Sequence, residues 1–196
     1  MSPFPEEVAD GVRAGDPDAV GAVYVALADR LLGYLVARVR DRAVAEDILE
    51  ATFLELLQRG RTIRGGAAAI KVWLFRAAYF NAIDHIRKVN RRMEDLTDNE
   101  QVLDVVVEGV AGPEELAVQS DLRSRVRTAM ELLSAEQRQV ILLRYVAGLS
   151  AVEISSVMDK SDGAIRSLQH RGERALAKLL ESERRSSAPF QGPGAS

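Results

Sequence analysis

The sequence predicts an all-α protein made of two small helical domains joined by an acidic linker. Three observations predict it. Apolar residues recur at steps of three and four along most of the 196-residue chain, which is the period of an amphipathic helix. Residues that commonly start or stop helices separate these periodic stretches. Acidic and basic residues are also unevenly spread, and their distribution divides the chain into blocks.

The amino-terminal block contains three expected long helices. Asp16 is a suitable N-cap for the first, and Pro17 is a suitable first residue because the first turn leaves its N–H unpaired in any case. Asp41 can cap the second helix, which covers residues 43–58. The glycine-rich stretch 59–69 breaks the pattern and is predicted to be a loop.

The third expected helix covers residues 71–92 and changes character along its length. Its first half is apolar and aromatic, whereas its end is basic. Trp73 recurs at helical spacing with Leu74, Ala77 and Phe80, so we expect Trp73 to be a core residue rather than a stacking platform.

The net charge of −3 is an average over three unlike blocks. Residues 1–92 contain 14 Lys and Arg against 12 Asp and Glu, residues 93–121 contain 9 acidic and no basic residues, and residues 122–196 contain 12 against 8. We therefore expect a domain over 1–92, a linker over 93–121, a second domain over 122–181 and a disordered tail over 182–196. Such asymmetry is typical of a protein with a charged partner such as nucleic acid, although a solvated linker between two ordinary domains also explains it.

The carboxy-terminal block is predicted to contain a helix-turn-helix. Ser134 can cap a helix that Gly148 ends, Ser150 can cap a short helix, and Ser161 can cap the helix that follows. Four apolar residues can fill the angle between the last two helices: Ile154, Val157, Ile165 and Leu168. In this motif the second helix lies in the major groove. A helical hairpin with a charged solvent face is the alternative.

The composition excludes several classes of protein. The absence of cysteine rules out disulfides and thiolate metal sites. No run approaches 18 uninterrupted apolar residues, and the first residues do not resemble a secretory signal, so we expect a cytoplasmic protein without membrane insertion. The two histidines, His85 and His170, lack a second histidine four residues on. We expect no catalytic residue, no metal site and no cofactor.

Four motifs, in this order, resemble the extracytoplasmic-function (ECF) class of the sigma-70 family. LLGYLVARVRDRAVAEDILEATFLELL and WLFRAAYFNAIDHIRK resemble the family's second domain, and LSAEQRQVILLRYVAGLSAVEISSVM and SDGAIRSLQHR resemble its fourth. The resemblance covers roughly residues 8–92 and 122–181. It implies a sigma factor that binds core RNA polymerase and directs promoter-specific initiation through −10 and −35 elements.

The resemblance also implies which residues contact each partner. The first domain would bind a coiled coil of the largest polymerase subunit through acid beside exposed apolar surface, at Glu46, Asp47, Leu49, Glu50 and Phe53. It would read and melt the −10 element with the loop before residue 71 and with Asn81, Asp84, Arg87, Lys88, Arg91 and Arg92. The last domain would read the −35 duplex with Arg166, Ser167, Gln169, His170 and Arg171. Further implied partners are the flap of the second-largest subunit and an anti-sigma factor.

Two other classes of function compete with this hypothesis. A stand-alone helix-turn-helix regulator would bind an operator without polymerase, but it does not account for the aromatic-then-basic helix at 71–92. An enzyme is disfavoured because the sequence has neither a metal-binding spacing nor a phosphate-binding glycine motif.

Overall fold

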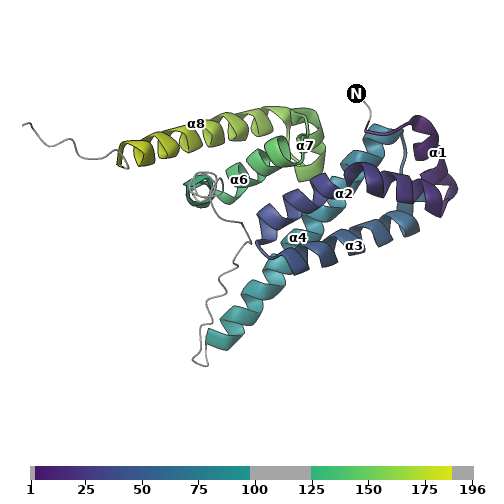
Figure 1. Ribbon diagram of the computed structural model, residues 1–196, viewed down its shortest axis with the longest axis horizontal. Coiled ribbons are helices and arrows are strands. Elements are labelled where there is room, and N and C mark those ends of the chain that lie inside the picture. The colour runs from purple at the N-terminus through teal and green to yellow at the C-terminus, as the bar shows by residue number, and fades with distance from the viewer. Residues whose placement is uncertain (1–2, 98–124, 187–196) are drawn as a thin grey trace, which may run out of the picture. The chain divides into compact units, whose positions relative to one another are not determined.

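The computed structural model describes residues 3–97 and 125–186, and every regular element within them is helical (Figure 1). The all-α fold class predicted from the sequence is confirmed. Most of the predicted linker, residues 98–121, and the end of the predicted tail, residues 187–196, lie outside the described residues.

The chain divides into two compact units. The described part of the first consists of residues 3–97 and 142–165, and that of the second consists of residues 125–141 and 166–186. The boundary between residues 165 and 166 therefore falls inside one helix, α8 (Asp162–Ser186).

Four helices form most of the first unit: α1 (Glu6–Ala14), α2 (Pro17–Val39), α3 (Arg42–Arg59) and α4 (Ala67–Thr97). The start of α2 is as expected, since the Asp16 carboxylate accepts from the Asp18 N–H at 3.0 Å. Asp41 caps α3 in the same way by accepting from the Val44 N–H at 3.1 Å. Both expected caps are confirmed, and both are local contacts.

The core of the first unit lies where α2 packs against α1, α3 and α4. Leu31 and Tyr34 of α2 are fully buried, and the Tyr34 ring meets the Phe75 ring of α4 edge-on, with centroids 6.3 Å apart. By length and composition α2 is the one helix among the described residues that could cross a membrane. Eight of its residues are buried inside the protein, which is how the central helix of a helical core behaves.

Several boundaries differ from those predicted. Helix α1 is absent from the predicted elements, although two glutamates in its first turn and left-handed Gly15 after its last residue are helix signals. The expected loop at 59–69 is shorter, because α3 includes Arg59, a 3-10 turn η1 occupies Gly60–Thr62, and α4 begins at Ala67. Helix α4 also extends into the predicted linker as far as Thr97.

The first unit also contains η2 (Leu142–Val146), a π-helical turn, and α7 (Ala151–Met158). Helix α7 packs against α4, and η2 packs against α2. Lys71 of α4 and Glu153 of α7 form an ion pair at 2.9 Å, and Arg76 donates to the Ser156 carbonyl at 2.5 Å. These two contacts join α4 to α7.

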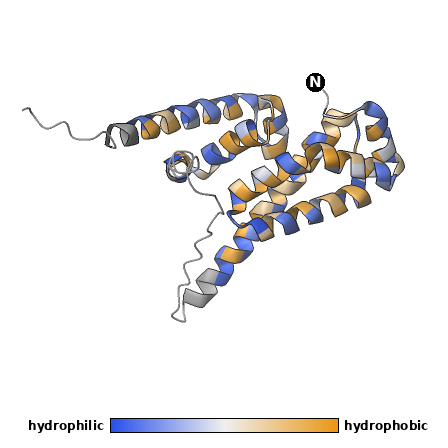
Figure 2. Ribbon diagram, in the orientation of Figure 1, coloured by the Kyte–Doolittle hydropathy of each residue, from blue (hydrophilic) through white to orange (hydrophobic). Residues whose placement is uncertain are grey.

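The second unit contains a helix over residues 125–131, α6 (Ala135–Ile141) and α8 from Arg166 onward. The Arg138 guanidinium donates to the Met130 carbonyl at 2.8 Å and to the Glu131 carbonyl at 2.7 Å. It thereby satisfies carbonyls at the end of a helix, which have no partner inside that helix. Helix α8 carries hydrophobic residues on one side and hydrophilic residues on the other (Figure 2), and it continues to Ser186, five residues into the predicted tail.

Candidate functional site

The acidic side of α3 is the first candidate surface. Glu46, Asp47 and Glu50 are exposed, and Glu46 forms an ion pair at 2.9 Å with Arg42, one turn earlier. The opposite side of α3 is buried against the rest of the first unit. The three carboxylates predicted to contact a partner therefore lie together on an accessible face.

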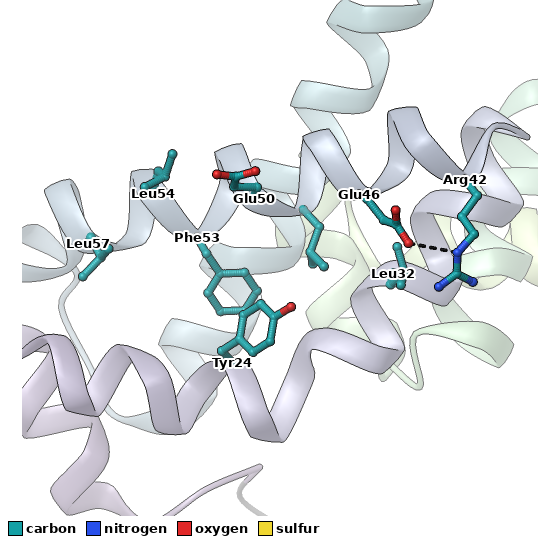
Figure 3. A pocket seen from close by; sticks show the side chains of 9 residues that line it. Tyr24, Leu32, Arg42, Glu46, Glu50, Phe53, Leu54 and Leu57 are labelled. Atoms are coloured by element: carbon teal, nitrogen blue, oxygen red, sulfur yellow. Dashed lines mark ion pairs between the residues drawn. The ribbon is translucent and has the colours of Figure 1, made fainter.

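The apolar residues predicted beside these carboxylates are not exposed, which corrects that expectation. Leu49 is 5% exposed and Phe53 7%, because they belong to the buried side of α3. They line a hollow of about 550 Å³ instead (Figure 3). The Phe53 ring contacts the Tyr24 ring of α2, with centroids 4.9 Å apart.

The exposed apolar surface at this hollow comes from three residues outside the predicted set, of which Tyr24 of α2 is 47% exposed. Leu54 is 49% exposed and Leu57 43%, and both line the hollow together with Glu50. The signal for them is present in the sequence. Leu54 and Leu57 are spaced three apart, so they share one side of the helix, but that side differs from the buried stripe.

The carboxy-terminal half of α4 is the second candidate surface. Four exposed basic residues follow one another within two turns: Arg87, Lys88, Arg91 and Arg92. Asp84 is also exposed and lies 3.8 Å from the Arg87 guanidinium, and the Arg91 side chain donates to the Arg87 carbonyl at 3.4 Å. The predicted basic end of the helix is thus presented to solvent.

Asn81, predicted near the same DNA element, is engaged within the protein. Its amide donates to the Glu55 carboxylate at 3.1 Å and to the Thr52 hydroxyl at 3.3 Å. Thr52 is fully buried and donates in turn to the Ile48 carbonyl at 2.6 Å. Asn81 therefore connects α4 to α3.

Trp73 is not a core residue, contrary to expectation. It is only partly buried, because the buried side of α4 carries Leu74, Ala78 and Ala82 at four-residue steps. Phe80 is 41% exposed, and the Arg76 guanidinium lies 5.3 Å from its ring centroid. The aromatic half of α4 is thus partly accessible.

The helix-turn-helix has the local geometry that its sequence predicts. Ser150 and Glu153 form a reciprocal capping box at the start of α7, and Asp159 ends that helix with a left-handed φ of 57°. The Ser161 hydroxyl accepts from the Ala164 N–H at 3.3 Å, as an N-cap of α8. The four apolar residues expected in the angle are all buried: Ile154, Val157, Ile165 and Leu168.

One side of α8 presents the residues predicted to read DNA. Arg166, Ser167, His170 and Arg171 are exposed. Gln169 is half-buried, and its amide donates to the Glu173 carboxylate at 2.8 Å. The exposed set combines two guanidiniums with two smaller hydrogen-bonding groups.

Glu153 takes part in the capping box with Ser150 and also forms the ion pair with Lys71. Burial alone would raise the pKa of this carboxyl group, but hydrogen bonds from Lys71 and Ser150 and the positive charge of Lys71 outweigh burial and lower the pKa below its ordinary 4.5. Glu153 therefore stabilises both the first turn of α7 and the contact between α7 and α4 while it is ionised.

No group of three or more His, Asp or Glu side chains in the described ranges, 3–97 and 125–186, could hold a metal ion. The candidate surfaces offer acid beside apolar side chains on α3, and basic side chains on α4 and α8. Such surfaces suit binding to proteins and to nucleic acid.

Known families match both parts of the chain. Residues 23–92 match the family model for Sigma-70 region 2, and residues 123–176 match that for Sigma-70, region 4. The chain is 33% identical to the ECF RNA polymerase sigma factor BldN of Streptomyces coelicolor over 91% of its own length and 67% of that protein. It is 32% identical to the RNA polymerase sigma factor CarQ of Myxococcus xanthus over 86% of its length and 92% of that protein. The chain belongs to the sigma-70 family, in its ECF class.

Two solved structures share the fold. The sigma factor RpoE from Bartonella quintana, in complex with the anti-sigma factor NepR, aligns with a TM-score of 0.65 at 22% identity, over 82% of this chain and 96% of RpoE. CnrH, in complex with the cytosolic domain of CnrY, aligns with a TM-score of 0.64 at 19% identity, over 90% of this chain and 97% of CnrH.

The two family models cover the candidate surfaces of this sigma factor. Sigma factors bind core RNA polymerase and direct it to promoters, and that is the function of this chain. Region 2 contains the acidic side of α3 and the basic end of α4, and region 4 contains α7 and the exposed residues of α8.

Proposed function

We propose that the surfaces of α3, α4 and α8 divide the work of initiation among them. The domain over residues 1–92 binds polymerase and reads the −10 element, and the domain over residues 122–181 reads the −35 element. The observation that carries this proposal is the presence of two separate exposed basic surfaces, one at the end of α4 and one on α8. The chain acts in the cytoplasm. It is not itself a catalyst, because the polymerase makes the RNA.

At the −10 element, α4 and the loop before it contact separated DNA strands. The basic residues at the end of α4 neutralise phosphates: Arg87, Lys88, Arg91 and Arg92. Extruding a base costs on the order of 3 kcal/mol in lost stacking and pairing, and contacts to the base and to the strand must offset this cost. Asp84 remains accessible for such a contact, whereas Asn81 first has to leave Glu55 and Thr52 or else acts by positioning α4.

At the −35 element, the start of α8 lies in the major groove. Arg166 and Arg171 can each form two hydrogen bonds with guanine, and Ser167 and His170 can add single hydrogen bonds. An amide side chain can read adenine, but Gln169 must then exchange its bond to Glu173 for one to the base.

Polymerase binds the acidic side of α3. Glu46, Asp47 and Glu50 attract a basic partner, while Leu54 and Leu57 supply the apolar surface that the partner buries. Leu49 and Phe53 lie on the buried side of α3 and support this surface by packing inside the first unit, not by contacting the partner. The flap of the second-largest polymerase subunit binds the domain over residues 122–181.

An anti-sigma factor is a further proposed partner. RpoE and CnrH were both solved with protein partners, an anti-sigma factor in the first case. A protein that covers the α3 surface would prevent this chain from binding polymerase. The measurement is inhibition of transcription by a candidate partner, reversed when that partner is removed.

In vitro transcription with core polymerase on a genomic library, with start sites mapped, tests the proposed function. The expected result is initiation from promoters that share two sequence elements, together with weak duplex binding by the chain alone. Tight operator binding without polymerase, combined with unchanged start sites, would contradict the proposal and support a stand-alone regulator.

Charge reversal tests the polymerase surface. Glu46→Lys combined with Asp47→Lys should weaken core binding, because it places positive charge where a basic partner docks. Asp18→Lys, at an exposed acid in the first turn of α2, is the control for a charge reversal away from α3 and should leave the affinity unchanged. Equal affinity of the α3 variant and the wild type would refute the assignment of this face.

A further inference from the structure

The loop between α3 and α4, residues 60–66, is held at both of its ends by one other helix. Three of its residues are polar and exposed: Arg61, Thr62 and Arg64. Ile63, between them, is buried and anchors the middle of the loop. The helix that holds the ends is α1, which is distant in sequence and absent from the predicted elements.

The start of the loop rests on Val12 of α1. Gly60 is buried there, and a Cβ on Gly60 would lie 2.7 Å from the Val12 methyl carbon and 3.1 Å from the Val12 carbonyl oxygen. Only a residue without a side chain fits this approach. The first residue of the loop is therefore fixed against α1 by shape.

The end of the loop is fixed by two polar side chains of α1. The Arg13 guanidinium donates to the carbonyl of Gly65, whose φ of 110° favours glycine. The Glu6 carboxylate accepts from the Ala67 N–H, with its two oxygens 3.1 and 3.3 Å from the nitrogen. Both contacts join residues more than 50 positions apart.

The Glu6 contact replaces a local N-cap at the start of α4. The first N–H groups of a helix have no partner inside it, and a carboxylate near them is stabilised by the helix dipole. For α2 and α3 an aspartate next to the helix supplies this group, whereas for α4 it comes from another helix. The point where α4 begins, and so where the loop ends, depends on α1.

We infer that Glu6 and Arg13 of α1 are positioning residues for the DNA-reading loop, holding Arg61, Thr62 and Arg64 in one arrangement before the single strand arrives. The inference rests on the proposed function, because it assumes that the loop contacts the −10 element. A loop that is already ordered loses less conformational freedom on binding, and a fixed geometry distinguishes bases better than a variable one. Glu6 and Arg13 contact the loop and not the DNA.

The test uses the full chain with core polymerase and a promoter panel in which each −10 position carries each of the four bases. Glu6→Ala removes the acceptor, Glu6→Gln keeps an oxygen that can accept from Ala67, and Glu7→Ala changes an exposed neighbour on α1. The measurements are initiation from every promoter, core affinity and thermal unfolding.

We expect Glu6→Ala to reduce the preference for the best −10 base by about fivefold, comparable to the loss of a helix cap. Glu6→Gln should restore most of that preference, and Glu7→Ala should match the wild type. Core affinity should be the same for all four proteins, because α3 carries the polymerase surface.

A uniform loss of initiation at every promoter, with unchanged base preference, would overturn the inference, since that pattern reflects stability alone. If Glu6→Ala does not fold, Arg13→Ala provides the same test by releasing the Gly65 carbonyl, and unchanged base preference in that variant also overturns the inference. Failure of the proposed function looks different, because the wild type itself then directs no initiation.

Discussion

Truncating Leu54 and Leu57 would separate side chains that contact a partner from side chains that hold the protein together. Both line the α3 hollow with nearly half of their surface exposed. Full burial of a leucine side chain is worth about 1.5–3 kcal/mol, so roughly 1 kcal/mol per residue remains for a partner to gain. We expect Leu54→Ala and Leu57→Ala each to weaken core polymerase binding about fivefold, and the double variant about 25-fold if the contributions add.

Leu49→Ala is the matched comparison on the same helix. It removes the same atoms from a buried position, so its cost should fall on folding, at about 2–5 kcal/mol of unfolding free energy, rather than on binding. Leu54→Ala should cost folding only about 1 kcal/mol, because only half of that side chain is buried.

The assay is titration of labelled protein with core polymerase at constant salt, accompanied by urea denaturation of each variant. Fully retained affinity in the double variant would refute the reasoning. So would a folded Leu49→Ala protein that loses more affinity than the double variant, since it would show that polymerase reaches the floor of the hollow.

Other parts of the structure support three more predictions. Arg166→Ala and Arg171→Ala should each reduce promoter selectivity by about 1–3 kcal/mol at one −35 base pair, whereas an equal loss on every promoter would indicate phosphate contacts only. Leu31→Ala, at a fully buried position of α2, should cost about 2–5 kcal/mol in urea denaturation, and a loss below about 1 kcal/mol would contradict the packing. Because the pKa of Glu153 is lowered on folding, its stabilisation is present above pH 4.5 and is lost as the pH falls through the lowered value. The unfolding free energy of Glu153→Gln should therefore fall less steeply below pH 4.5 than that of the wild type, and equal slopes would disprove the assignment.

Local signals in the sequence are sufficient for most of the helices and their caps. Asp16, Asp41, Ser150 and Ser161 each accept from a backbone N–H two or three residues ahead, as their positions predict. The all-α fold class and the helix-turn-helix follow from such signals together with apolar spacing. Helix α1 also carries local signals, but it is missing from the prediction.

Which side of a helix is buried is predicted less well, because burial depends on the neighbouring helices. Leu49 and Phe53 belong to the apolar pattern of α3, but α3 is apolar around much of its circumference, so periodicity does not say which apolar residues stay exposed. The same ambiguity misplaces Trp73, which lies one position away from the buried series of α4.

Sequence signals alone predict where most helices begin, how charge is divided along the chain and which family the motifs resemble. Those properties depend on residues within a few positions of one another or on order along the chain. Helix packing, by contrast, places Leu54 and Leu57 at the hollow, joins Asn81 to Thr52 and sets Glu6 at the start of α4. These contacts link residues on different helices, and a side chain's partner there is decided by how the helices pack.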